Sequence, residues 1–325
     1  MNSVDIAVIG AGPAGLYAAY YAGFRGFSVA VIDALAEPGG QVTAMYPEKD
    51  IFDIAGFQRV KGRDLVDGLL AQAQSFNPTF YLSQQVTELI ETDDSIELRS
   101  ESGLALSAKA VIITGGIGAF TPRPIPVGME WLGKGLVHFV PRLADHEGKD
   151  VVIVGGGDSA FDWAVSLHPI AKSVTLVHRR DAFRAHAATV DMVRDLGVRL
   201  VTSAEVTAIS GDDCVKSVTV AFKESGTSEV LPAGTVVAAL GFVANIGPIA
   251  NWGFEVEKRH IVVNTSMMTS MRRVFAAGDI ATYPGKVPLI AVGFGEAATA
   301  VNNAAPFVNP DEGVFPGHSS GSSSD

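Results

Sequence analysis

A glycine-rich signature between an apolar strand and a helix occurs twice in this chain, and it limits the folds open to both halves. The first copy reads Val8-Ile9-Gly10-Ala11-Gly12-Pro13-Ala14-Gly15, and the second reads Ile153-Val154-Gly155-Gly156-Gly157-Asp158-Ser159-Ala160. The first glycine of such a loop allows a tight turn, the second lets the backbone approach a pyrophosphate, and the third, where alanine is also permitted, lets helix and strand pack closely. The repeat predicts two βαβ units, each with a dinucleotide site at the start of its helix.

The two copies differ at the position that tells dinucleotides apart. At the same offset from the first glycine, copy one has Asp33 and copy two has His178, followed by Arg179 and Arg180, with Arg184 a turn later. A carboxylate there accepts a hydrogen bond from an adenosine ribose 2′-hydroxyl, whereas guanidinium groups suit a 2′-phosphate. The basic run could instead be a solvated surface, but the βαβ geometry directs this position at the ribose. We therefore expect FAD at the first copy and NADPH at the second.

The residues expected at the two sites follow from the chemistry of the loops. Pro13 has no N–H, so phosphate donors of the first loop are expected from Ala14 and Gly15. The FAD contacts predicted on these grounds are Gly10, Gly12, Ala14, Gly15 and Asp33. The predicted NADPH contacts are Gly155, Gly157, Asp158, Ser159, Ala160, His178, Arg179, Arg180 and Arg184.

Composition places the chain among soluble globular proteins, and its 325 residues predict about two domains. The net charge of −11 repels nucleic acid and anionic lipid, so neither is an expected partner. Cys214 is the single cysteine and cannot form an intramolecular disulfide, which favours a reducing cytoplasm. The first strand is expected to begin by residue 4, so we expect no signal peptide. The uncharged stretch Gly234 to Phe254 is long enough to span a membrane, but its glycines and Pro248 favour a buried strand and a loop.

Apolar periodicity predicts an α/β fold with two domains. Helices are expected at residues 14–23, 62–74 and 189–196. Further strands are expected at residues 80–82, 95–99, 105–109, 110–113, 199–201, 217–222 and 236–240. The cluster Pro122, Pro124 and Pro126 indicates a linker, and the segment 274–279 resumes the pattern of the first half.

The class expected is therefore α/β, with two Rossmann-like, three-layer domains and the NADPH domain inserted into the FAD domain. The expected bounds are residues 1–118 and 244–325 for the FAD domain, with a C-terminal extension from about residue 306, and residues 119–243 for the NADPH domain.

Four motifs together resemble the flavoprotein reductases of the thioredoxin reductase type. They are Gly10 to Gly15, Gly155 to Ala160, the run His178-Arg179-Arg180-Asp181-Ala182-Phe183-Arg184-Ala185, and Ala277-Gly278-Asp279. Thioredoxin reductases carry a Cys-x-x-Cys pair shortly before the second glycine motif. This chain has Leu136-Val137-His138-Phe139-Val140-Pro141 there, so it has no dithiol to relay electrons.

Three further signatures are similar to those of the homodimeric ferredoxin–NADP reductases of bacteria and archaea. They are Tyr46-Pro47-Glu48-Lys49, the stretch Gly155 to Ala164, and the tail from Gly293-Phe294-Gly295-Glu296-Ala297 through His318-Ser319-Ser320. In that family, the positions that match Asp33, Gln41, Tyr46, Val86, Phe120, Asp279 and Ser320 contact FAD. The resemblance also implies that the flavin ring lies between Tyr46 and His318, with His318 supplied by the partner subunit.

Each of these residues also has a purely structural interpretation. Tyr46 could be a packed loop aromatic, Gln41 an ordinary turn residue, and Asp279 the cap of a turn. Val86 is expected in the core by its side chain, so that any contact with adenine would be made by its backbone. Phe120 could pack in the linker, and His318 could belong to a disordered tail. We expect no protein acid or base in the reaction and no metal.

The function implied is hydride transfer from NADPH to FAD, followed by transfer of single electrons to a 2Fe–2S ferredoxin. Flavodoxin, a quinone or oxygen could be the acceptor instead, and a non-catalytic flavin and NADPH sensor is an alternative of another class. Ferredoxin and flavodoxin are acidic, as is this chain, so docking requires a local basic patch. Arg59, Lys61 and Arg63 are one candidate, although a solvated turn explains them equally well.

Overall fold

The computed structural model describes residues 2–315 and 317. The chain forms two compact units. The larger unit runs to Ala119 and resumes at Ala244, and the smaller unit, Phe120–Val243, is inserted between these two parts. The strands β9 (Ala119–Pro122) and β18 (Phe242–Asn245), which pair with each other, lie where the chain passes from one unit to the other.

In the described part of the chain, the larger unit is built on a seven-stranded sheet. Its parallel strands run in the order β5-β2-β1-β8-β21. These strands are β1 (Asn2–Ile9), β2 (Val29–Ile32), β5 (Thr79–Tyr81), β8 (Ala105–Ile113) and β21 (Val274–Ala276). Antiparallel strands β7 (Ile96–Ser100) and β6 (Val86–Glu91) continue from the N-terminal half of β8. Because the carboxyl ends of parallel strands meet at one edge, the loops after β1, β2, β8 and β21 converge there.

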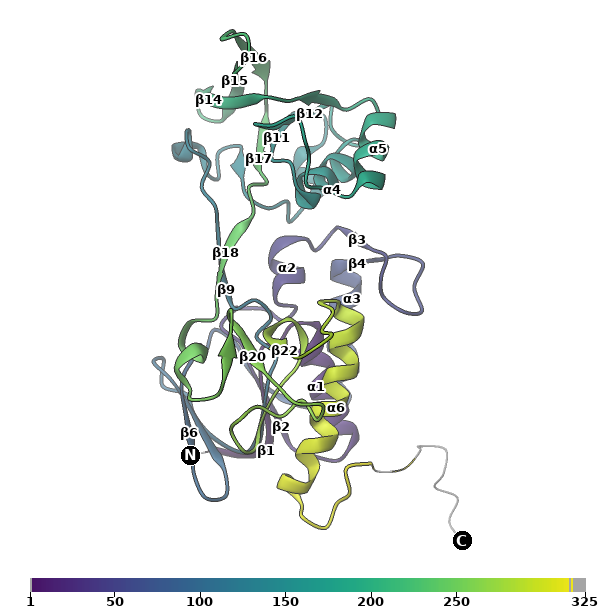
Figure 1. Ribbon diagram of the computed structural model, residues 1–325, viewed down its shortest axis with the longest axis vertical. Coiled ribbons are helices and arrows are strands. Elements are labelled where there is room, and N and C mark those ends of the chain that lie inside the picture. The colour runs from purple at the N-terminus through teal and green to yellow at the C-terminus, as the bar shows by residue number, and fades with distance from the viewer. Residues whose placement is uncertain (1, 316, 318–325) are drawn as a thin grey trace. The chain divides into compact units, whose positions relative to one another are not determined.

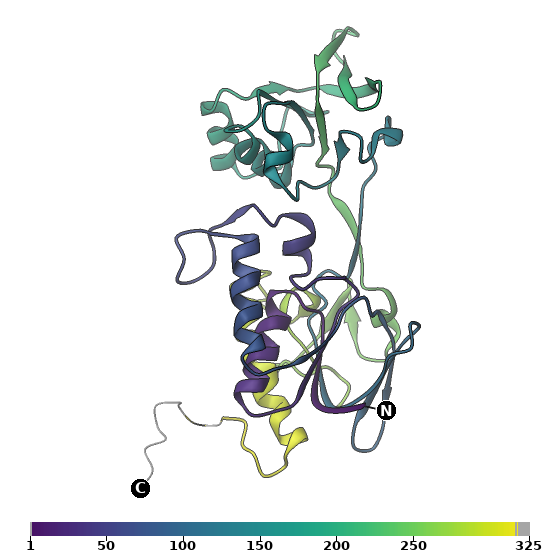
Figure 2. The same cartoon turned by 180° about the vertical axis from the view of Figure 1, so that it is seen from behind.

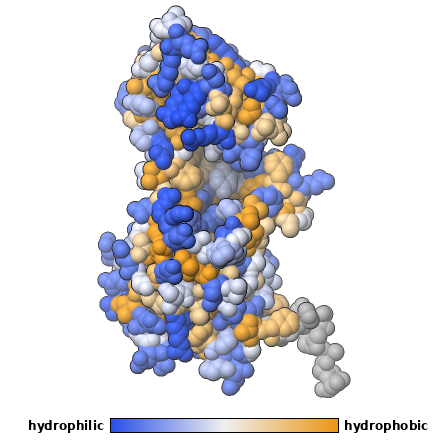
Figure 3. Space-filling model, viewed as in Figure 1, coloured by the Kyte–Doolittle hydropathy of each residue, from blue (hydrophilic) through white to orange (hydrophobic). Residues whose placement is uncertain are grey.

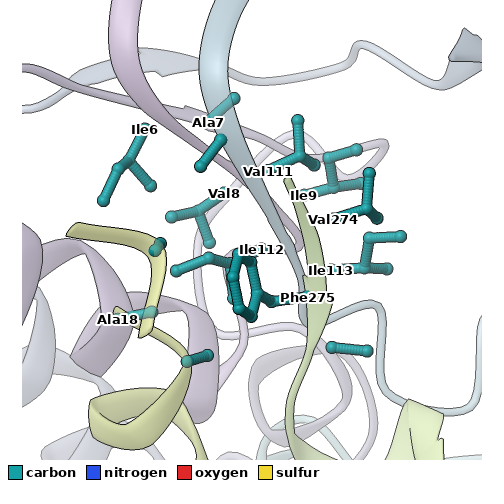
Figure 4. Packing of buried hydrophobic residues seen from close by; sticks show 14 of the residues in the cluster. Ile6, Ala7, Val8, Ile9, Ala18, Val111, Ile112, Ile113, Val274 and Phe275 are labelled. Atoms are coloured by element: carbon teal, nitrogen blue, oxygen red, sulfur yellow. The ribbon is translucent and has the colours of Figure 1, made fainter. Parts of the chain in front are cut away.

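Side chains on both faces of this sheet are buried, as expected for central parallel strands. Val8, Ile112 and Phe275 lie on one face near Ala18 of the helix that follows β1, and Val111 lies on the other face (Figure 4). All five are fully buried. Burying an apolar side chain of this size stabilises a fold by about 1.5–3 kcal/mol, so this core holds the strand ends in place.

The helices α1 (Pro13–Phe24), α3 (Gly62–Gln74) and α6 (Ile290–Val308) lie side by side on one face of the sheet (Figures 1 and 2). α1 and α6 bury small side chains, such as Ala18 and Ala22 in α1 and Ala297 and Ala300 in α6. These small side chains let the two helices pack closely. The other elements of this unit are α2 (Gln41–Met45), β3 (Asp50–Ile51), β4 (Val60–Lys61), η3 (Gly247–Asn251), β19 (Val256–Glu257), β20 (His260–Val262), η4 (Gly278–Ile280) and β22 (Ala281–Thr282).

The smaller unit has its own parallel sheet, in the order β10-β17-β11-β12-β13. Its strands are β10 (Leu136–Val137), β11 (Asp150–Val154), β12 (Ser173–Val177), β13 (Arg199–Val201) and β17 (Thr235–Ala238). The helices α4 (Asp158–Leu167) and α5 (Ala187–Asp195) pack against each other. An antiparallel sheet of β14 (Ala204–Gly211), β15 (Val215–Phe222) and β16 (Ser228–Pro232), and the short turns η1 (Met129–Trp131) and η2 (Leu143–His146), complete the unit.

The α/β class with Rossmann-like parallel sheets is confirmed, and several predicted elements require correction. Residues 105–109 and 110–113 form the single strand β8, because its N-terminal half pairs with β7 and its C-terminal half with β21. The helix expected at 189–196 is Ala187–Asp195. The strands β6, β14 and β16 were not predicted. In the uncharged stretch Gly234 to Phe254, the structure has β17, β18 and η3, and no helix among the described residues is long and apolar enough to cross a membrane.

Candidate functional site

The first glycine loop joins β1 to α1 at the carboxyl edge of the large sheet, and two of its glycines are required by close packing. Gly10 has φ +110°, and a Cβ on it would lie 2.5 Å from the carbonyl oxygen of Thr114. A Cβ on Gly15 would lie 1.8 Å from the carbonyl oxygen of Gly10. The Thr114 Oγ1 donates a hydrogen bond to the same Gly10 oxygen at 2.8 Å. Strand, loop and helix are therefore held together without room for a side chain.

Gly12 differs from these glycines because its missing side chain leaves open space. Its φ is −72°, which any residue can adopt, and no described atom lies within 4 Å of an ideal Cβ placed on it. A Cβ on Gly40 would lie 3.1 Å from the Gly12 Cα, so two glycines face each other here. The N–H of Gly39 donates to the Ala11 carbonyl at 2.8 Å and ties the two loops together.

This open cradle fits the pyrophosphate of a dinucleotide. The N–H groups of the first turn of a helix have no partner within the helix, and at α1 they include those of Ala14 and Gly15. The Gln41 side chain reaches the same edge, since its Nε2 lies 2.8 Å from the place of a Cβ on Gly116, just after β8. Gln41 thus adds an amide donor and acceptor to the cradle.

Asp33 follows β2 and organises the backbone at one end of the cradle. Its Oδ2 accepts from Ala11 N at 2.6 Å, and its Oδ1 accepts from Leu35 N at 2.8 Å. Burial raises the pKa of the Asp33 carboxyl, and these two N–H donors oppose that shift. Each carboxylate oxygen has two lone pairs, so both can still accept from a ribose hydroxyl. Val86 begins β6 and its side chain is buried in the core, as its structural interpretation expects.

Tyr46 and Asp279 lie near each other at the same edge of the sheet. Tyr46 directly follows α2, and Asp279 lies in η4 after β21. Burial, followed by the negative charges of Asp279 and Asp53, raises the pKa of Tyr46 to about 12. Burial also raises the pKa of Asp279, an effect that the positive charge of Lys286 opposes. The Tyr46 phenol therefore stays protonated and can present a flat, neutral ring to a flavin.

A buried polar cluster adjoins Asp279, and sequence reasoning did not find it. Glu296 is only 4% exposed, and its carboxylate accepts from Gly278 N at 2.8 Å, from Tyr283 Oη at 2.6 Å and from Lys286 Nζ. Burial, followed by the hydrogen bond to Glu296, raises the pKa of Tyr283 to about 12. One sequence feature could have indicated this cluster, because Glu296 is the one charged residue in the otherwise uncharged segment 290–308. Thr114, which holds Gly10, carried no comparable signal.

The second glycine loop joins β11 to α4 in the smaller unit and repeats the first. A Cβ on Gly155 would lie 2.4 Å from the Ala239 carbonyl oxygen, so this glycine is required by packing. No described atom lies within 4 Å of a Cβ placed on Gly157, which leaves open space at the start of α4. Ser159 is exposed in the first helical turn, and Ala160 is buried. The loop thus has the same pattern of closed and open glycines as the first.

The loop after β12 gathers the predicted basic residues beside this second cradle. A Cβ on Gly156 would lie 2.3 Å from the His178 ring, so the imidazole packs directly on the glycine loop. Burial lowers the pKa of His178, and the charges of Arg179, Arg180 and Arg184 lower it further, against a hydrogen bond to the Ala182 backbone. The imidazole is therefore neutral at pH 7, and the three exposed guanidinium groups carry the positive charge.

Asp158 and Arg184 attach this basic loop to the glycine loop. The Asp158 Oδ1 accepts from His186 N at 2.9 Å, and Arg184 N donates to the Gly156 carbonyl at 2.7 Å. The carboxylate of Asp158 therefore holds the basic loop against α4. A planar guanidinium group is well suited to bind a phosphate with two parallel hydrogen bonds, so this arrangement fits a 2′-phosphate.

The structure does not test the FAD contacts predicted for Phe120, His318 and Ser320. Phe120 packs edge-to-face with Phe139 and Phe242, at ring centroid distances of 6.0 and 6.3 Å, which matches its interpretation as a linker residue. Its contact with FAD stays a prediction. His318 and Ser320 lie outside the described residues.

Residues 4–304 match the sequence model of the family described as pyridine nucleotide-disulphide oxidoreductase. The chain belongs to this family. The ferredoxin–NADP reductase of Nocardioides sp. is 61% identical over 321 residues, which cover 98% of this chain and 97% of the relative. That of Saccharopolyspora erythraea is 60% identical over 319 residues, 98% of each chain. The solved thioredoxin reductase of T. acidophilum has a TM-score of 0.78 at 26% identity, over 94% of this chain and 98% of that one.

These findings confirm the family resemblance drawn from the motifs and show that the protein is an oxidoreductase. Family membership implies FAD and NADP(H) as cofactors, and the two glycine cradles fit such dinucleotides. Among the described residues, no group of three or more His, Cys, Asp or Glu side chains could hold a metal ion.

Proposed function

We propose that this protein transfers electrons from NADPH through FAD to a 2Fe–2S ferredoxin. The observation that carries the proposal is the difference between its two glycine cradles, with Asp33 beside one and Arg179, Arg180 and Arg184 around the other. The relatives at 60 and 61% identity are named ferredoxin–NADP reductase.

The lack of a dithiol favours a one-electron acceptor over a disulfide. Cys214 is the single cysteine of the chain, and it is exposed between β14 and β15. The thioredoxin reductases that the motifs resemble pass electrons through a Cys-x-x-Cys pair, which this chain lacks. Electrons therefore leave this protein directly from its flavin.

The larger unit supplies the residues that hold FAD. The open cradle at Gly12 and the first turn of α1 receive the pyrophosphate, Asp33 accepts from the ribose, and Asp279 accepts from the ribityl chain. Tyr46 and Gln41 meet the ring system. The family resemblance assigns His318 and Ser320 of the tail, which lie outside the described residues, to the same site from the partner subunit. When bound, FAD accepts a hydride from NADPH and gives up electrons singly; the chain orients the cofactors and excludes water.

The smaller unit supplies the residues that hold NADPH. The open position at Gly157 and the first turn of α4, with Ser159, receive the pyrophosphate. Arg179, Arg180 and Arg184 bind the 2′-phosphate. Asp158 and His178 support the shape of this site. The Asp158 carboxylate holds the basic loop, and the neutral His178 imidazole packs on Gly156. No side chain has to donate or accept a proton in this scheme.

A comparison of acceptors tests the proposal. The purified protein, supplied with NADPH, is expected to bleach its flavin rapidly and to reduce cytochrome c steadily only when ferredoxin is added. Flavodoxin, a quinone, oxygen and thioredoxin are tested in parallel at equal concentration. Faster turnover with one of these would identify it, and not ferredoxin, as the acceptor. Flavin bleaching without turnover on any acceptor would favour the interpretation of the protein as a flavin and NADPH sensor.

We also propose a cytoplasmic homodimer, in which the tail of one subunit covers the flavin of the other. The aromatic side of α1 supports association, because the large side chains of Phe24 and the neighbouring Phe76 are half-exposed. The Tyr20 ring contacts both, with centroid distances of 6.1 Å to Phe24 and 5.7 Å to Phe76.

For ferredoxin docking we propose the loop of residues 52–59, between β3 and β4. Phe52 and Phe57 are 69% and 53% exposed, while Ile54 between them is buried in the core and anchors the loop. The space-filling view shows hydrophobic and hydrophilic residues next to each other on this loop (Figure 3). Arg59 and Lys61 are exposed at its end. Exposed aromatic residues bordered by charge are typical of an interface, and Asp53 places the loop next to Tyr46.

Replacing both phenylalanines by alanine is expected to raise the KM for ferredoxin about tenfold, because truncating an anchor residue at an interface costs over 1 kcal/mol. Ferricyanide reduction with NADPH, which needs no docking, should not change. Val230→Ala removes an apolar side chain of similar exposure (64%) from the smaller unit and serves as the control. An unchanged KM for ferredoxin in the double variant would place the docking surface elsewhere.

A further inference from the structure

One buried ion pair holds the peptide groups of Gly278 from both sides. The Glu296 Oε2 accepts from Gly278 N at 2.8 Å, and Lys286 Nζ donates to the Gly278 carbonyl oxygen at 3.0 Å. The same Nζ lies 2.6 Å from Glu296 Oε2, which closes the arrangement. The side chains of Lys286 and Glu296 are only 10% and 4% exposed. We name these two residues, with Gly278, the glycine clamp.

The glycine clamp lies against the first turn of α1. Gly278 has φ +78°, and a Cβ on it would lie 3.2 Å from the Ala14 Cβ. A Cβ on Gly293 of α6 would lie 3.3 Å from the Gly278 Cα. The clamp therefore fixes the strand end after β21 to α6 and to the cradle of the first loop. Asp279, the next residue along the chain, takes its position from the clamp.

Stability alone does not explain a charged pair at this place. Removing two charges from water is costly, and a hydrophobic pair of similar volume is often as stable or more so. The hydrogen bonds to Gly278 and Tyr283 recover part of that cost. What a hydrophobic pair could not do is hold both the N–H and the carbonyl of Gly278, or place opposite charges next to Asp279.

We propose that Lys286 and Glu296 are positioning residues for the flavin end of the site, whose paired charges orient Gly278 and Asp279 and leave no uncompensated charge to shift the reduction potential of the bound flavin. This inference rests on the proposed FAD site of the larger unit. Reduction adds negative charge to the cofactor, so a nearby uncompensated cation favours the reduced form and an uncompensated anion disfavours it. In the intact pair these two effects cancel.

The test is the midpoint potential of the bound flavin in single and double variants at pH 8. Lys286→Met leaves the Glu296 anion and is expected to lower the potential, while Glu296→Gln leaves the Lys286 cation and is expected to raise it. A tenfold change in the relative affinity for reduced and oxidised FAD corresponds to about 30 mV for a two-electron couple. The double variant should return to near the wild-type potential, because it carries neither charge. The FAD dissociation constant should rise about tenfold in each single variant.

Arg25→Met is the control, because it breaks another ion pair of the same unit in which the cation is buried. The Arg25 side chain is 3% exposed and lies 2.9 Å from Glu312. It follows the last residue of α1, about 18 Å along the helix axis from the glycine loop. Arg25→Met should lower the free energy of unfolding, as we also expect of the Lys286 and Glu296 variants, and leave the flavin potential unchanged.

Shifts of opposite sign in the two single variants would support the inference. Shifts of the same sign, or no shift beyond that of Arg25→Met, would show that the pair is only structural. Should the single variants not fold, Tyr283→Phe removes one neutral donor from Glu296 and should lower the potential by a smaller amount; an unchanged potential there would overturn the inference as well. A wild-type protein that binds no FAD would instead overturn the proposed function.

Discussion

Gly12→Val is expected to give a folded protein that retains little or no FAD. The φ of Gly12 is one that valine adopts without strain, and its Cβ would meet no described atom of the protein. The new methyl groups would occupy the open cradle that we assign to the pyrophosphate. A steric cost of about 3 kcal/mol would weaken FAD binding roughly 100-fold. Flavin absorbance after purification, and titration of the stripped protein with FAD, measure this effect.

Gly68→Val is the control for this experiment. Gly68 lies in α3, and a Cβ there also meets no described atom within 4 Å. The same substitution at Gly68 should leave a yellow protein, with only a small loss of stability or none. If Gly12→Val bound FAD as tightly as the wild type, the pyrophosphate would have to lie elsewhere and the assignment of the first cradle would be wrong.

Replacing Arg179 and Arg184 by glutamine is expected to lower kcat/KM for NADPH by about 10²–10⁴. A hydrogen bond to a charged group contributes about 1.5–3 kcal/mol, which is a factor of roughly 10–150 for each guanidinium group. Turnover with NADH should change little, because NADH has no 2′-phosphate for these residues to bind. Steady-state kinetics with both nucleotides therefore separates recognition of the phosphate from general damage to the smaller unit.

Arg194→Gln is the control, because it removes one positive charge from the same unit without touching the basic loop. Arg194 is an exposed arginine at the end of α5 in the same unit, where it pairs with Asp191 at 3.1 Å. This variant should use NADPH as the wild type does. Equal use of NADPH and NADH by the wild-type protein would contradict the role assigned to the whole basic loop.

The sequence determined the parts of this protein that depend on neighbouring residues. A strand, a glycine loop and a helix are encoded by side chains close together in the chain, so both βαβ units were predicted with their glycines. The helix at 62–74 was predicted for the same reason, since its apolar spacing is local. The difference between Asp33 and the basic run at 178–184 could also be read directly, because the βαβ geometry fixes where the residue after the second strand points.

Only the tertiary structure decided which distant residues meet. Strand pairing joined residues 105–113 into β8 and added β6, β14 and β16, which pair with β7 and β15. The meeting of strand ends at one edge of the parallel sheet brings Tyr46 next to Asp279, and Gln41 next to Gly116. The ion pair between Lys286 and Glu296 exists because folding buries both charges against one glycine. A sequence shows each charge separately, whereas the low-dielectric interior around them, which makes the pair necessary, forms only when the strands and helices pack.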